Sequence, residues 1–112
     1  MNVSFHGIGQ WCATFLGDGI PEGAVVKVTG QGTAAACAAG DPFCGVAVAG
    51  DKEACTVQLG GFARLSYDTA APAIGYTALS ADGKGGVQSD EDGQSYWVVE
   101  QDAAAKTVTI LL

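Results

Sequence analysis

Short apolar segments separated by glycine-rich turns are the feature that most limits how this chain can fold. The sequence of 112 residues holds 17 glycines, and turn signals such as Gly17-Asp18-Gly19 and Asp92-Gly93 recur at short intervals. Glycine supplies the positive φ angles that tight turns need. The segments between these turns are too short for most helices. The spacing therefore predicts an all-β fold.

Six segments carry the β-branched or alternating apolar pattern of half-buried strands. In the last of them, Val108 and Ile110 alternate with threonines. Regular short strands favour a small barrel or sandwich. The Ala-rich segments 34–39 and 103–105 are short and flanked by Gly or Asp, so we expect loops there. The predicted strands are 24–29, 44–49, 56–59, 62–67, 96–100 and 107–112.

Gly60 and Gly61 lie between two of these strands and have two interpretations. A glycine pair is suited to a hairpin turn. The apolar residues, however, keep the same phase on both sides, from Val57 to Tyr67, as one continuous strand bent at the glycines requires. Both arrangements stay open, and a bent strand serving two sheets would form the corner of a small barrel.

A weak internal repeat runs through the same segments. Pro21 and a following glycine are echoed by Pro72 and a following glycine. Chance similarity among Gly- and Val-rich strands explains the alignment equally well. A true repeat predicts two interlocked halves within one β fold rather than two domains. In the alignment, 44–48 corresponds to 96–100 and 56–59 to 107–110.

Charge and hydropathy exclude two classes of partner. The chain has five basic and 12 acidic residues and a net charge of −7, and its cations are far apart in sequence. Nucleic-acid binding needs clustered Lys and Arg, so we expect no nucleic-acid partner. No apolar run has the length of a membrane span, so we expect no membrane partner either.

The cysteines, Cys12, Cys37, Cys44 and Cys55, have two interpretations. In a secreted chain they would form two disulfide bridges. The N-terminus has neither a basic start nor an apolar stretch, so we expect no secretory signal and synthesis in the cytoplasm. We therefore favour reduced thiols that pack as small buried hydrophobic residues.

A search for catalytic and metal sites is negative, so we expect no enzyme and no cofactor. The sole histidine is His6, and no G-x-S-x-G or C-x-x-C pattern occurs. The acidic turn at Asp90 lacks the glycine and glutamate of a calcium loop, with Ser95 and Gln101 in their places. Gly85 follows Lys84 where a phosphate loop requires Ser or Thr.

The N-terminal residues are the candidate partner-binding segment. We expect a flexible arm over residues 1–10 and a single β domain over residues 11–112. Trp and Tyr are enriched at interface hot spots, and Trp11 precedes the first good strand pattern, so we expect it to be an exposed anchor. Phe5 and Ile8 lie beside glycines in the arm, which we expect to add as a strand on a partner. Trp97, followed by two valines, is expected in the core or at a contact between subunits.

Several motifs carry a resemblance to a known family. They are GAVVKV (23–28), CGVAV (44–48), TVQLGGF (56–62), PAIGY (72–76), ADGKGGV (81–87) and KTV (106–108). Together they resemble the small capsid decoration, or head-stabilising, proteins of tailed bacteriophages. The resemblance implies a β-rich, commonly trimeric protein that binds the outside of an expanded capsid and clamps neighbouring subunits of the major capsid protein. It also implies a place on the virion after synthesis in the host cytoplasm.

Three other interpretations remain open. A carbohydrate- or surface-binding β module would use Trp11 or Tyr76 as a stacking platform. A small barrel enzyme would need a pocket with converging polar groups, and the sequence lacks any motif for one. A structural β protein of unrelated origin is the third.

Overall fold

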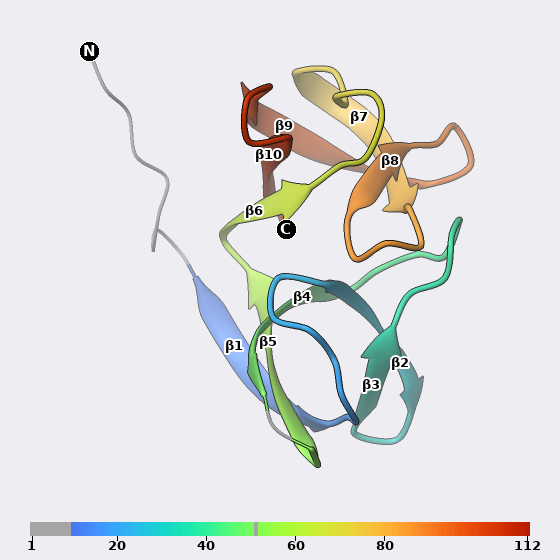
Figure 1. Cartoon of the computed structure of the whole chain (residues 1–112), viewed down its shortest axis with the longest axis vertical. Coiled ribbons are helices and arrows are strands. Elements are labelled where there is room, and N and C mark those ends of the chain that lie inside the picture. The colour runs from blue at the N-terminus through green and yellow to red at the C-terminus, as the bar shows by residue number, and fades with distance from the viewer. Residues whose placement is uncertain (1–9, 51) are drawn as a thin grey trace.

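Ten strands and no helix make up the described part of the chain, residues 10–50 and 52–112 of the computed structural model (Figure 1). The all-β prediction is therefore confirmed. In chain order the strands are β1 (Trp11–Leu16), β2 (Val25–Gly30), β3 (Thr33–Ala36), β4 (Gly45–Gly50), β5 (Ala54–Gly60), β6 (Phe62–Ser66), β7 (Gly75–Ala81), β8 (Val87–Ser89), β9 (Gln94–Asp102) and β10 (Thr107–Leu111).

The strands form two sheets with the same internal order. The first sheet is a closed barrel with the strand order β1-β5-β4-β2-β3, and we call it the first barrel. Parallel pairing of Leu16 with Thr33 joins β3 to β1 and closes it. The second sheet has the order β6-β10-β9-β7-β8. Each strand of the second sheet thus occupies the place of the strand five positions earlier in the chain. The fold is a duplicated five-stranded unit, as the weak repeat suggested.

Each of the two sheets has a β-bulge at the equivalent place, and the two bulges correct the sequence alignment. In the β4–β5 hairpin, the pairing passes over Val48, and in the β9–β10 hairpin it passes over Val99. The structure therefore makes Val48 equivalent to Val99, whereas the sequence alignment placed it on Glu100. A bulge adds one unpaired residue, and a comparison of letters alone does not place it.

The bend at the two glycines joins the halves. β5 belongs to the first barrel and β6 to the second sheet, so the hairpin interpretation is wrong and the bent-strand interpretation is correct. Gly61 has a φ of 84°, in the left-handed region that favours glycine. Gln58, itself buried, donates its side-chain amide to the carbonyl oxygens of Gly60 at 3.0 Å and Phe62 at 2.8 Å.

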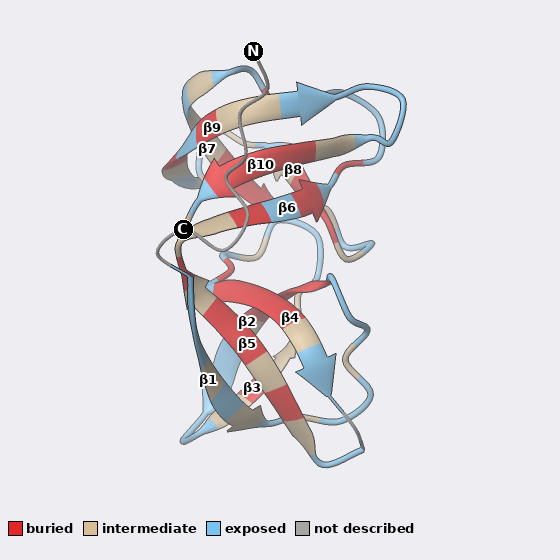
Figure 2. Ribbon diagram, turned by 90° about the vertical axis from the view of Figure 1, so that its left-hand side faces the viewer, coloured by how far each residue is buried: buried red, intermediate tan, exposed pale blue. Residues whose placement is uncertain are grey.

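Two clusters of buried side chains form the core, and one of them spans both halves. The first cluster fills the first barrel around Val26 and Val57. The second fills the second sheet, and it also includes Val25 and Val46 from the first barrel. Residues of the first barrel therefore belong to the core of the second sheet. Figure 2 shows buried segments in both halves, on β4 and β5 of the first barrel and on β6 and β10 of the second sheet.

Four strands were not predicted from the sequence. β3 begins at Thr33 and extends into the segment 34–39 that was expected to be a loop, and β1, β7 and β8 carried no recognised strand pattern. β3 and β7 are rich in alanine, which has weak β propensity. Ala34 is nevertheless buried in the barrel interior, in the cluster that includes Val26 and Val57. The other Ala-rich segment, 103–105, is a turn, as expected.

Candidate protein-binding surface

A row of apolar side chains crosses the outer face of the second sheet. Tyr76 on β7 is paired with Trp97 on β9, Trp97 with Leu111 on β10, and Leu111 with Phe62 on β6. We call these four residues the aromatic row. Tyr76 is 66% exposed and Trp97 54% exposed, while Phe62 is half-buried. The two exposed rings lie 5.0 Å apart between centroids, tilted by 38°.

The alternation of each strand puts this row outside. On β9, Tyr96 and Val98 point into the core, so Trp97 between them points outward. The prediction that Trp97 is part of the core is therefore wrong, and the alternative contact between subunits is untested. The valines after Trp97 suggested burial, but the phase of the strand decides the side.

Trp11, a predicted anchor, is exposed at the junction of the two halves. It is the first residue of β1 rather than a residue before the first strand, and it is paired with Gly60. Its side chain is 57% exposed. A Cβ atom on Gly60 would lie only 1.8 Å from the indole Nε1, so the ring rests directly on this glycine. The other predicted anchors, Phe5 and Ile8, lie outside the described residues, with nearly all of the predicted arm.

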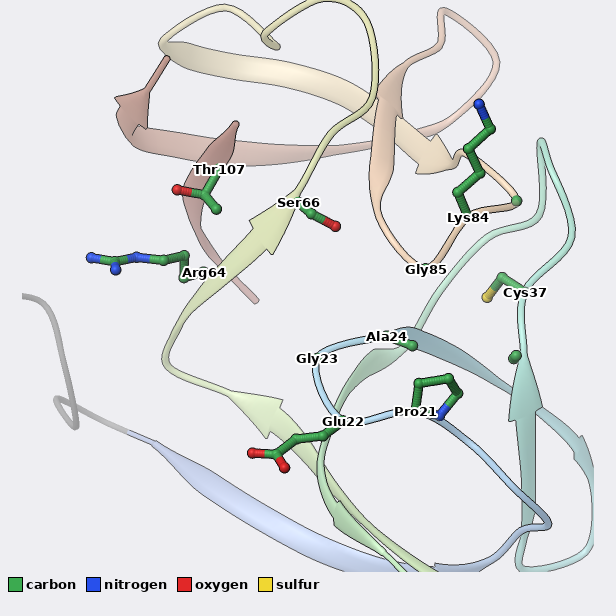
Figure 3. A pocket seen from close by; sticks show the side chains of 12 residues that line it. Pro21, Glu22, Gly23, Ala24, Cys37, Arg64, Ser66, Lys84, Gly85 and Thr107 are labelled. Atoms are coloured by element: carbon green, nitrogen blue, oxygen red, sulfur yellow. The ribbon is translucent and has the colours of Figure 1, made fainter. Parts of the chain in front are cut away.

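A cleft of about 590 Å³ lies between the halves, but its polar groups do not converge. The guanidinium of Arg64 and the ammonium of Lys84 extend away from its middle (Figure 3). Lys84 is 2.6 Å from the carboxylate of Asp68. Burial raises the pKa of the Cys37 thiol to about 11, so this thiol stays protonated at neutral pH. The other titratable side chain of the lining is the carboxylate of Glu22, on the segment between β1 and β2.

The acidic turn before β9 is held by its own hydrogen bonds. Asp90 accepts hydrogen bonds from the Ser80 hydroxyl at 2.8 Å and from the Asp92 backbone N–H at 2.9 Å. The bond from Ser80 is the main cause that lowers the pKa of Asp90. Among residues 10–50 and 52–112, no three His, Cys, Asp or Glu side chains group closely enough to hold a metal ion. His6 lies outside these residues.

The four cysteines are free, but they do not share one environment. Cys55 is buried in the first barrel, as expected of a small hydrophobic residue. Cys12 and Cys44 are exposed, and Cys37 is half-buried. The prediction of buried thiols is therefore wrong for Cys12 and Cys44. Cys12 lies on the outer face of the barrel beside Trp11, and Cys44 precedes β4.

The fold and this surface define a class: an all-β protein of two linked five-stranded sheets with exposed aromatic side chains. No protein-family model and no curated protein matches the chain. The described residues contain no helix that would cross a membrane.

Proposed function

We propose that this chain is a structural protein that binds the outside of a bacteriophage capsid and stabilises the lattice by clamping subunits of the major capsid protein. The observation that carries the proposal is that large apolar side chains are exposed on the outer surface of the protein. The two halves that present them are joined by one buried cluster. Contiguous exposed apolar side chains mark interaction sites in soluble proteins. The resemblance of the sequence motifs to capsid decoration proteins is the reason for proposing the major capsid protein as the partner.

Trp11 and the segment before it make the contact with the capsid. The indole of Trp11 lies directly on Gly60 at the end of β5, so the side chain loses little conformational freedom on binding. Phe5 and Ile8 extend the same contact, and residues 1–10 add to the capsid as an extended strand. Each copy buries a modest area, and a trimer multiplies the contact through avidity.

Co-sedimentation with expanded capsids tests this proposal. The capsids are assembled from the major capsid protein encoded in the same genome. We expect the wild-type protein to co-sediment, a deletion of residues 2–10 to abolish binding, and Trp11→Ser to weaken it about tenfold or more. Ile74→Ser, which also removes an exposed apolar side chain, is the matched control and leaves binding unchanged. Failure of the wild-type protein to bind contradicts the proposal.

Carbohydrate binding is the second candidate, and the exposed pair of Tyr76 and Trp97 favours it. Adjacent aromatic rings offer a platform on which a sugar ring stacks. Binding of the wild-type protein to a glycan array, lost in Tyr76→Ala and kept in Trp11→Ser, supports this function over capsid binding.

A further inference from the structure

β6 is an edge strand of the second sheet: in the described part of the chain, β10 alone is paired with it. Residues of an antiparallel strand alternate between those that bond to the partner strand and those whose backbone groups point away from it. Tyr67, which follows β6, donates its backbone N–H to the carbonyl oxygen of Lys106 at 3.1 Å. Before β6, Gly61 accepts a hydrogen bond from the backbone N–H of Leu112 at 2.9 Å. Odd positions therefore bond to β10, and the N–H and C=O of Arg64 point to the opposite side, which we call the β6 edge.

The cleft between the two halves lies beside the β6 edge. Arg64 and Ser66 are both among the residues that line this cleft of about 590 Å³ (Figure 3). The space closes toward the end of β6, because a Cβ atom on Gly86 would lie 2.2 Å from the carbonyl oxygen of Ser66. A strand that adds to this edge therefore ends beside Arg64.

The start of β1 lies on the same side as the β6 edge. β1 is antiparallel to β5 and begins beside the bend through which β5 continues into β6 (Figure 1). The side-chain amide of Gln10, just before β1, donates to the side-chain oxygen of Gln58 at 3.2 Å. The same Gln58 side chain donates to the carbonyl oxygen of Phe62 at 2.8 Å. Phe62 is at an even position, so this carbonyl points to the same side as the backbone groups of Arg64.

The hydrogen-bond phase of β1 decides which residues before it can bond to β6. Gly17, which follows β1, donates its backbone N–H to the carbonyl oxygen of Glu53 at 3.1 Å, so odd positions of β1 bond to β5. The bulge beside Trp11 shifts the register by one residue and pairs Trp11 with Gly60. From the bulge onward, odd positions of the first strand therefore face even positions of its partner.

Continuation of this register matches the β6 edge. Four residues further along both strands from the pair of Trp11 with Gly60, Gly7 lies opposite Arg64. Gly7 is at an odd position and Arg64 at an even one, so the backbone groups of both point at each other. Gly9 comes where this strand must follow the bend of its partner, and glycine adopts the backbone angles of such a bend.

We propose that residues 7–9 of the same chain continue β1 along the β6 edge and cover one side of the cleft. The occupant is this segment because it is joined to Gln10, which already lies at the bend, and a tethered segment has a high effective concentration. Phe5, beyond the added strand, stays available to a partner. The contact belongs to the free protein. Only the release of residues 7–9 from β6 when the arm adds to the capsid rests on the proposed function.

Hydrogen exchange at single backbone amides, followed by NMR in the free protein, tests the proposal. We expect the Arg64 amide to exchange about tenfold or more slowly in the wild type than in a deletion of residues 2–9. The amides of Ala63 and Leu65 point to β10, and their rates change by less than about twofold. Fast exchange of Arg64 in the wild type overturns the proposal, and so does slow exchange that survives the deletion.

Two proline variants separate strand pairing from a loose contact. Gly7→Pro removes the N–H that the register directs at Arg64, so the Arg64 amide exchanges as fast as in the deletion. His6→Pro is the matched control, because the register directs the N–H of residue 6 away from β6, and it leaves the exchange rate at the wild-type value. Equal rates in the two variants overturn the pairing.

A mixing experiment identifies the occupant of the edge. The isotope-labelled deletion variant is mixed with an excess of unlabelled wild type, and its Arg64 amide still exchanges fast, because each wild-type segment pairs within its own chain. Slower exchange on mixing overturns the proposal, since the segment would then bind a second copy. These samples contain no capsids, so a failure here leaves the co-sedimentation result unchanged, and a failure to co-sediment leaves the exchange rates unchanged.

Discussion

The side-chain amide of Gln58 donates to the carbonyl oxygen of Phe62 at 2.8 Å, across the bend at which the chain passes from the first barrel to the second sheet. The same amide also donates to Gly60, and its oxygen accepts a hydrogen bond from the Gln10 side chain at 3.2 Å. One buried polar side chain therefore forms hydrogen bonds to backbone carbonyl groups on both sides of the bend between the two halves.

Replacement of Gln58 by methionine, which preserves its volume, is expected to lower the free energy of unfolding by about 1–3 kcal/mol. The substitution removes the buried side-chain amide that donates hydrogen bonds to the carbonyl groups of Gly60 and Phe62. Urea titration measures the change. Gln94→Met, at an exposed position of β9, is the control and changes stability by less than about 0.5 kcal/mol. Equal stability of the two variants contradicts this role for Gln58.

Gly86→Ala is expected to destabilise the fold by about 3 kcal/mol, because a Cβ atom there would lie 2.2 Å from the carbonyl oxygen of Ser66. The methyl group forces apart β6 and the start of β8, the two edges of the second sheet. Thermal unfolding reports the loss. Gly30→Ala, whose nearest neighbour would be 3.9 Å away, serves as the comparison and stays within about 0.5 kcal/mol of the wild type. A Gly86→Ala protein with a wild-type melting temperature would show that the edges do not approach so closely.

Acid is expected to weaken the fold through aspartates whose pKa values are lowered in the folded state. A hydrogen bond from Lys27 lowers the pKa of Asp41 below its ordinary 3.8, and one from Lys84 lowers that of Asp68. A lowered folded pKa gives stability that is present above the unfolded value and lost as pH falls through the folded value. Stability is therefore flat above about pH 5 and declines below about pH 4.

Asp41→Asn checks the source of this decline, because it removes the titratable carboxylate that accepts hydrogen bonds from Lys27 and from the Ala38 backbone N–H. Urea midpoints measured from neutral pH down to about pH 2.5 should show a shallower decline in this variant than in the wild type. Asp18→Asn, on an exposed turn, should follow the wild type. An Asp41→Asn curve parallel to that of the wild type would remove Asp41 from the explanation.

The four thiols are expected to react with iodoacetamide at clearly different rates at neutral pH. Cys12 is exposed and reacts first. Cys44 is also exposed, but partial burial of its sulfur raises its pKa, so it reacts more slowly. Cys37, with a pKa raised to about 11, and the buried Cys55 react last. Peptide mass spectrometry over a time course gives the order, and rapid labelling of Cys55 in the folded protein would contradict the packing of the first barrel.

Alternation of apolar residues was sufficient to predict the strands that carry valine, leucine and isoleucine, and its constant phase pointed to the bend at Gly61. It was insufficient for β3, in which Ala34 is the buried residue, and for β8, which has only three residues. Tertiary packing stabilises both strands despite weak local preference.

The aromatic row was not predictable in the same way. Tyr76, Trp97 and Phe62 are distant in sequence, and only the pairing register of four strands brings them into line. Phe62 and Trp97 lay in predicted strands, whereas Tyr76 lay in a segment without a recognised strand pattern. The register depends on turn lengths and on the bulge at Val99, which alternation does not encode.

Alkylation of Cys12 in the presence of capsids tests the central claim most directly, since this thiol follows Trp11 in the chain and is exposed in the free protein. The rate is measured with and without saturating expanded capsids, and Cys44 in the same molecule is the internal reference. If the outer surface around Trp11 binds the capsid, labelling of Cys12 slows about tenfold or more while that of Cys44 is unchanged. Labelling of Cys12 at the free rate on capsids that have bound the protein would contradict the account.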